Sequence, residues 1–139
     1  MKEINLVTKI RVYSYNELSE TDKNLVDLAK NATQRAYAPY SRFNVGAALL
    51  LENGEIITGS NQENVAFPSG ICAERTTCFY ANSSYPGVRF VKLAIAAFHN
   101  GAFTPHPVSP CGACRQVRAG YANLGRAKLE IVLDGDDEL

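Results

Sequence analysis

Three cysteines and one glutamate have the types and the spacing of a hydrolytic metal site. Cys72 stands two residues before Glu74, and a Cys-x-x-Cys pair, Cys111 with Cys114, follows a proline. Three thiolates suit zinc, and three protein ligands leave the fourth position of a tetrahedral site open for water. A carboxylate beside that position can carry protons. We therefore expect one zinc ion per chain, bound by the three cysteines, with Glu74 as the catalytic proton carrier.

Two helix N-termini are expected to position these side chains. Pro68-Ser69-Gly70 breaks the chain before Cys72, and residues 73–81 favour a helix. Pro110 likewise precedes a second helix that begins with the Cys-x-x-Cys pair. A helix N-terminus stabilises a thiolate through its free N–H groups and its dipole. The two helices would therefore bring their cysteines to one metal ion.

Two arginines follow metal-ligand cysteines directly in the sequence. Three thiolates and Zn²⁺ carry a net negative charge, which opposes ionisation of a bound water. We expect Arg75 and Arg115 to offset that charge from outside the ligand shell. The alternatives are that the arginines form surface salt bridges and that Glu74 only stabilises a helix N-terminus.

The spacing of apolar residues, helix caps and turn residues along the rest of the sequence predicts an α/β fold. Strands are expected at residues 4–13, 43–51, 55–59, 90–98 and 129–133, and helices from Ser19 to Tyr37, over 73–81 and after Pro110. Asn53-Gly54 predicts a tight hairpin whose two strands lie near the middle of the sheet. Residues 100–109 are expected to form a loop. Helices between later strands imply crossover connections, hence a mixed sheet covered by helices.

The charge composition indicates which kind of ligand the chain binds. A chain of 139 residues with 14 basic and 14 acidic side chains has no excess positive charge for a polynucleotide, so a small neutral ligand is expected. No stretch near the start resembles a signal peptide, and no apolar run is long enough to span a membrane. The expected compartment is the reducing cytoplasm, where cysteines serve as ligands or buried thiols.

These motifs resemble those of the zinc-dependent nucleoside and nucleobase deaminases. The match is best with the small cytidine deaminases that use three cysteine ligands, because it extends over residues 40–48, 61–64 and both cysteine motifs. The resemblance implies a three-layer α-β-α sandwich around a mixed β-sheet. It also implies a homotetramer in which neighbouring subunits help to close each site. Residues 1–139 would form a single catalytic domain of this kind.

The resemblance also implies a reaction and a set of substrate contacts. Cytidine, and deoxycytidine, would be hydrolysed to the uracil nucleoside and ammonia, as in pyrimidine salvage. Asn61 and Glu63 would bind the ribose hydroxyls, Phe43 would line the base pocket, and Ala73 would contact the base through its backbone. Arg75 would pair with the zinc thiolates.

Two departures and three alternatives accompany the resemblance. Phe67 stands where the family has tyrosine, and the family's C-terminal tail is expected to be missing after Leu139. Blasticidin S deaminase shares the cysteine pattern, but residues 61–64 favour a ribonucleoside. A structural zinc module would need Cys78, His99 or His106 as a fourth ligand. A polynucleotide deaminase is disfavoured by the neutral charge.

Overall fold

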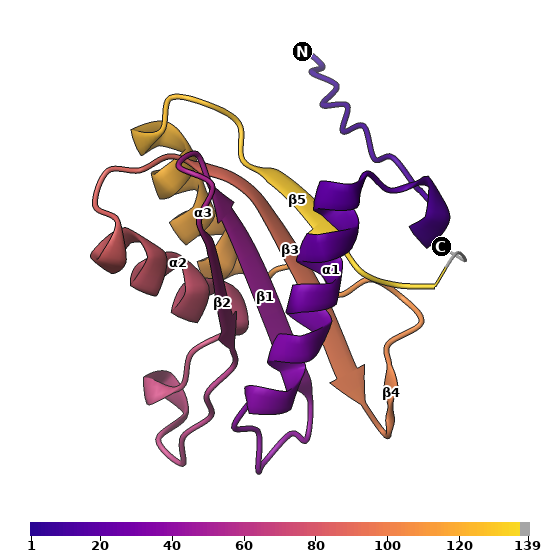
Figure 1. Cartoon of the computed structure of the whole chain (residues 1–139). Helices are drawn as coiled ribbons and strands as arrows, with labels where there is room; N and C mark the ends of the chain where they lie inside the picture. The colour runs from indigo at the N-terminus through magenta and orange to yellow at the C-terminus, as the bar shows by residue number, and fades with distance from the viewer. Residues whose placement is uncertain (137–139) are drawn as a thin grey trace.

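The computed structural model describes residues 1–136 and shows one β-sheet between two layers of helices (Figure 1). The helices are α1 (Glu20–Ala32), α2 (Ala73–Ser84) and α3 (Gly112–Leu124), and the strands are β1 (Asn44–Leu51), β2 (Ile56–Ser60), β3 (Phe90–His99), β4 (Ala102–Phe103) and β5 (Glu130–Leu133). Short 3₁₀ turns lie at Tyr15–Glu17, Thr33–Arg35 and Phe67–Ser69. Among residues 1–136, no helix has both the length and the apolar character needed to cross a bilayer.

The sheet is mixed, as the sequence predicts. β1 pairs antiparallel with β2 on one side and with β3 on the other. The far edge of β3 pairs antiparallel with β4 and parallel with β5. The hairpin at Asn53-Gly54 is confirmed, but its expected central position is wrong for β2, which forms an edge of the sheet. Within residues 1–136, only β1 and β3 are flanked by strands on both sides, which explains their nearly continuous apolar sequences.

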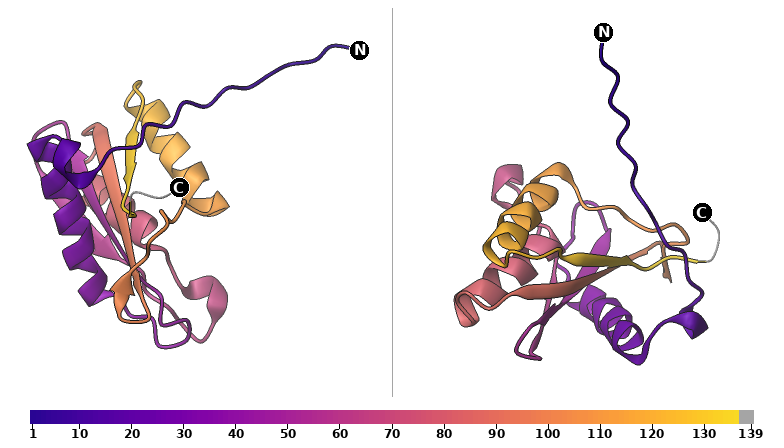
Figure 2. Two further views of the ribbon diagram at one scale, coloured as in Figure 1. Left: turned by 90° about the vertical axis from the view of Figure 1, so that its right-hand side faces the viewer. Right: turned by 90° about the horizontal axis from the view of Figure 1, so that it is seen from above.

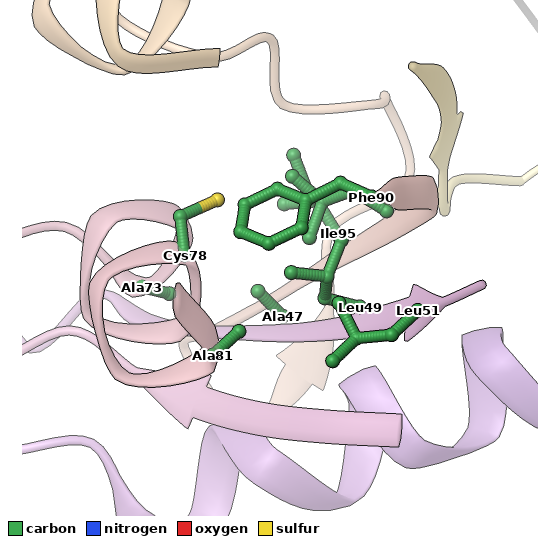
Figure 3. Close-up of a cluster of buried hydrophobic side chains, with 9 residues drawn as sticks. Ala47, Leu49, Leu51, Ala73, Cys78, Ala81, Phe90 and Ile95 are labelled. Atoms are coloured by element: carbon green, nitrogen blue, oxygen red, sulfur yellow. The ribbon is translucent and has the colours of Figure 1, made fainter. Parts of the chain in front are cut away.

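The two faces of the sheet carry separate apolar clusters. α1 covers one face, and α2 and α3 cover the other (Figure 2). Under α2, alternate residues of β1 meet Phe90 and Ile95 of β3 (Figure 3). Under α1, the fully buried residues of the sheet are the alanines Ala48, Ala94 and Ala96. This arrangement confirms the predicted three-layer α-β-α sandwich.

The α1 layer lies unusually close to β1. Ser19 caps α1 by accepting a hydrogen bond from the Asp22 N–H, at 3.1 Å, as its sequence predicts. Gly46 of β1 faces the end of the helix. A methyl group at Gly46 would overlap the carbonyl oxygen of Ala29 and lie 2.7 Å from the Thr33 nitrogen. Both contacts are with backbone atoms, so the helix itself would have to move.

Gly46→Ala is therefore expected to lower the free energy of unfolding by ~1–3 kcal/mol, the usual cost of overpacking a core. The matched control is Gly120→Ala in α3, where an added methyl group meets nothing within 4 Å. Because alanine is the better helix former, the control should gain ~0.5–1 kcal/mol. Urea unfolding of the two variants checks the pair. Equal stability of Gly46→Ala and the parent would contradict the close packing of α1 on β1.

Two local expectations are wrong. Residues 4–13 form no strand, because no described edge pairs with them, and they extend away from the body. Residues 100–109 are not wholly a loop, because Asn100 (φ 53°) and Gly101 (φ 81°) form a tight turn that pairs β4 with the end of β3. Asn100-Gly101 is the same Asn-Gly signal that predicts the hairpin at Asn53-Gly54. Part of the acidic C-terminal segment, residues 137–139, lies outside the described residues.

Candidate metal centre and active site

The first turns of α2 and α3 bring three thiols together. Cys72 is the N-cap of α2, Cys111 is the N-cap of α3, and Cys114 lies in the first turn of α3. Their sulfur atoms all lie within 4.8 Å of one another, and the Cys72 and Cys111 sulfurs are 3.8 Å apart. A tetrahedral zinc with Zn–S bonds of ~2.3 Å sets its sulfurs ~3.8 Å apart. The thiols therefore have the spacing of a zinc site.

The charges at the cluster also fit a cation. Hydrogen bonding to Cys114 lowers the pKa of the Cys72 thiol against the effect of burial, and Arg75 lowers it further. The same hydrogen bond raises the pKa of Cys114, and burial adds to that effect. A metal ion binds cysteine through its thiolate, and the surroundings of Cys72 favour that form.

Glu74 lies beside the ligands without joining them. It occupies the first turn of α2, the residue is only 6 % exposed, and it is not part of the thiol group. Burial raises the pKa of the Glu74 carboxyl, and the negative charge of Cys72 raises it further. Such a carboxyl holds a proton more readily than a solvated glutamate, as a group that both accepts and donates protons requires.

The two arginines have different environments. Arg75 Nη2 lies 3.6 Å from the Cys72 sulfur, and its Nε is buried without a hydrogen-bond partner. Arg115 Nε donates instead to the carbonyl oxygen of Pro110, at 3.0 Å. Arg75 is thus placed to compensate sulfur charge, whereas Arg115 fixes the turn that leads into Cys111.

The polar residues after β2 hold the loop before β1. Asn61 Oδ1 accepts from the Val45 N–H at 2.8 Å, and its Nδ2 donates to the Phe43 carbonyl at 2.9 Å. Glu63 Oε1 accepts from the backbone N–H groups of Tyr40 and Ser41 at 3.0 and 3.2 Å. Hydrogen bonds led by that of Ser41 lower the pKa of the Glu63 carboxyl.

This polar segment is tied directly to the metal-ligand segment. Gln62 and Ile71 exchange two backbone hydrogen bonds of 2.9 Å, so residues 61–63 run beside the residue that precedes Cys72. Ala73 is fully buried between Cys72 and Glu74. The structure therefore brings the polar pair and the thiol cluster to the same end of the sheet, although they come from separate parts of the sequence.

Phe43 has a neighbour that the sequence did not reveal. Its ring centroid lies 5.3 Å from that of His99, the last residue of β3. His99 Nδ1 is 3.0 Å from the Arg42 carbonyl oxygen, and because that oxygen can only accept, Nδ1 is the donor. The overlooked turn at Asn100-Gly101 is the local signal that could have located His99 at a strand end.

The family model for the cytidine and deoxycytidylate deaminase zinc-binding region matches residues 19–122 of this chain. The chain belongs to this family. A cytidine deaminase of Sporosarcina psychrophila is 48% identical over 117 residues, which are 84% of this chain and 81% of that protein. One from Halalkalibacterium halodurans is 52% identical over 95 residues, 68% and 67% of the two chains.

The family's solved structures share the fold. The crystal structure of a cytidine deaminase from Burkholderia pseudomallei superposes with a TM-score of 0.68 and 40% identity, over 85% of this chain and 86% of that one. As a member of this family, the chain is a zinc-dependent enzyme. The three thiols form a set of donor atoms that fits the ion.

No fourth protein ligand completes the deaminase metal centre among residues 1–136. Cys78 is buried in the α2 cluster, where burial raises its pKa to about 12. His99 is bonded to the loop before β1, and His106 is not part of the thiol group. The closed site that a structural zinc module requires is therefore not formed by the described residues.

Proposed function

We propose that this chain is a cytidine deaminase, which hydrolyses cytidine and deoxycytidine to the uracil nucleoside and ammonia. The observation that carries the proposal is an open three-thiol group at two helix N-termini with a buried carboxyl, Glu74, beside it. An open ligand position is what distinguishes a catalytic zinc site from a structural one. The two relatives described above are both named cytidine deaminase.

Each residue of the site has a role in this reaction. Bound zinc supplies Lewis-acid activation of water. The Glu74 carboxylate takes one proton from the attacking water and passes it to the ring nitrogen of the base. It then takes the second proton from the newly added hydroxyl group and delivers it to the amino group, which leaves as ammonia. Arg75 keeps negative charge on Cys72 by donating to its sulfur. Arg115 holds the Pro110 turn, so that Cys111 and Cys114 keep their directions.

Substrate recognition is assigned to the residues around the polar segment. Phe43 lines the base pocket, and Ala73 contacts the base through its backbone. Asn61 and Glu63 bind the ribose hydroxyls. One oxygen of Glu63 is occupied by the loop before β1, so its second oxygen is the one available to accept from a hydroxyl. This dual use ties ribose binding to the shape of the loop that carries Phe43.

Two variants of Glu63 separate these roles. Glu63→Gln keeps an oxygen for the Tyr40 and Ser41 N–H groups and loses the charged acceptor, whereas Glu63→Ala loses both. Loss of a charged hydrogen bond costs ~1.5–3 kcal/mol, so kcat/KM for cytidine should fall at least about tenfold in either variant. Activity on free cytosine, which has no ribose, should change less in Glu63→Gln. Equal losses on both substrates would mean that Glu63 supports the loop or the metal site only.

The purified protein with cytidine provides the direct test of function. Uridine formation, followed by ultraviolet absorbance, is the expected result. Turnover of blasticidin S with none of cytidine would assign the chain to the related deaminase. Zinc binding without turnover of any aminopyrimidine nucleoside would mean that the chain is a non-catalytic zinc-binding module.

Assembly and location complete the proposal. The chain acts as a single catalytic domain in a homotetramer, and exposed apolar side chains on and before α2 support such an interface. They are Val65, Phe67, Phe79 and Tyr80. Phe67, which is 90 % exposed, lies in the segment where the family has tyrosine. The enzyme works in the cytoplasm, in pyrimidine salvage, where a reducing environment keeps its thiols available to zinc.

A further inference from the structure

His99 and Phe43 lie opposite each other where β3 ends and β1 begins. The antiparallel register of the two strands runs to Asn44 opposite Phe98, and one further step places Phe43 opposite His99. Residues that stand directly opposite in an antiparallel pair project their side chains on the same face of the sheet. This register explains why the two ring centroids are 5.3 Å apart. The two side chains therefore form a cross-strand pair.

This pair projects from the face of the sheet that α2 covers. Side chains alternate between the two faces along a strand. Val45 of β1 packs against the α2 cluster, so Phe43, two positions earlier, comes to the same side. Ile95 of β3 belongs to that cluster, and the same alternation puts His99 on that side. Ala73, in the segment that carries the metal ligands, is part of the cluster too. The pair thus continues the face on which the metal centre is built.

The imidazole of His99 also holds the backbone next to Phe43. Its Nδ1 donates to the carbonyl oxygen of Arg42, at 3.0 Å. Arg42 has a φ of 54°, in the left-handed region that few side chains adopt. Such a conformation persists only where the surrounding structure maintains it. The hydrogen bond from His99 therefore fixes the peptide group that leads into Phe43.

His99 is itself held by its neighbours. The turn at Asn100-Gly101 folds β4 back on β3, so that Ala102 pairs with His99 on the side away from β1. Both Phe43 and His99 are half-buried. Part of the Phe43 ring therefore remains accessible to a ligand, while its other contacts are fixed by a residue at a paired strand end.

We propose that His99 is a positioning residue for the base-binding pocket, where it fixes the orientation of Phe43 that contacts the pyrimidine. The inference rests on the proposed function, in which Phe43 lines that pocket. A side chain that is already ordered loses less conformational freedom when the ligand binds. Because Phe43 contacts the base both before and during the reaction, loss of His99 should raise KM for cytidine and leave kcat nearly unchanged.

Three substitutions separate the two contacts of His99. His99→Asn keeps an N–H donor near the position of Nδ1 and removes the ring, His99→Phe keeps a ring and removes the donor, and His99→Ala removes both. Contacts of either kind correspond to ~2–10-fold in a binding constant. KM should rise by that factor in the first two variants and by more in His99→Ala. An unchanged KM in His99→Ala, or a fall in kcat at unchanged KM, would overturn the proposal.

Phe103→Ala is the matched control. The Phe103 ring packs on that of Phe98 with centroids 5.2 Å apart, and Lys30 of α1 lies 5.1 Å from the Phe103 centroid. This second ring pair is therefore at the same strand end but on the α1 face. Its loss should leave KM unchanged. An equal rise in KM in Phe103→Ala and His99→Ala would mean that any loss of packing at this strand end weakens binding, and it would overturn the positioning role.

A double variant tests whether His99 acts through Phe43. Phe43→Ala removes the ring that His99 orients, so adding His99→Ala to it should change KM by less than about twofold, as expected for two residues that act as a unit. If the effects of the two single variants multiply in the double variant, His99 contributes to binding by another route and the proposal fails.

The tautomer of His99 gives a readout that does not depend on turnover. At a pH where the imidazole is neutral, the ¹⁵N shifts of the His99 ring should show the proton on Nδ1, because the hydrogen bond to Arg42 selects that tautomer. A proton on Nε2 would contradict the hydrogen bond. A parent without turnover of cytidine would overturn the proposed function and this inference with it, whereas an active parent whose His99 variants keep its KM would overturn this inference alone.

Discussion

Glu74→Gln is expected to lose nearly all turnover of cytidine while it keeps the fold and the zinc. The amide has the shape of the carboxylate and cannot exchange protons. General acid–base catalysis by one residue typically accounts for ~10²–10⁴-fold in rate. Glu74 serves several proton transfers in one cycle, so the loss should reach at least the upper part of that range. The measurement is kcat for cytidine in parent and variant.

The variant must also be shown to be intact. Zinc content and the urea unfolding curve of Glu74→Gln should match those of the parent, because the Glu74 side chain is not one of the ligands. Glu74→Asp is the companion variant, since it keeps a carboxyl and withdraws it by one methylene group. It should retain more activity than the amide. Turnover of Glu74→Gln within about tenfold of the parent would assign the proton transfers to another group.

Local signals explain most of what the sequence predicted about the fold. The cap at Ser19, the turn at Asn53-Gly54 and the proline before Cys111 each act within a few residues of themselves. Their effects can be read without knowing the rest of the molecule. The three-layer arrangement then follows because helices alternate with strands that must pair in one sheet.

Contacts between distant segments were beyond such reasoning. The sequence suggested that Asn61 and Glu63 face a ligand, but it did not show that both hold the loop before β1. Nor did it place His99 against Phe43, because their contact depends on how β1 and β3 align. Pairing register brings residues together that are far apart in the chain, and it is set by the whole sheet.

The N-terminal arm, residues 1–13, is a second case in which local sequence signals do not determine strand pairing. Its alternation correctly describes a segment with two faces, yet a strand exists only where an edge is available to pair with it. The single chain does not bring the arm to such an edge. Alternation of apolar and polar residues thus predicts that a segment can form a strand. The strand forms only where the edge of a sheet is available to pair with it.

Cys111→Ser is expected to lose the zinc while the helix that carries it remains. Cys111 is exposed and has the extended backbone of an N-cap, and serine is among the preferred N-cap residues. The substitution therefore spares the start of α3 and removes one thiolate. Loss of a residue that only supports a ligand costs ~10–100-fold in metal affinity, so loss of a ligand should cost more. Zinc per chain, measured by elemental analysis after dialysis, should fall close to zero.

Thermal unfolding with and without a chelator separates this effect from misfolding. A metal that binds only the folded state stabilises it, so a chelator should lower the Tm of the parent and leave that of Cys111→Ser unchanged. Cys78→Ala is the matched control, because Cys78 is a buried cysteine on α2 outside the thiol group. It should keep a full complement of zinc and the chelator-dependent shift in Tm. Full zinc occupancy in Cys111→Ser would remove this residue from the metal site, and the convergence of the two helix N-termini would then need another explanation.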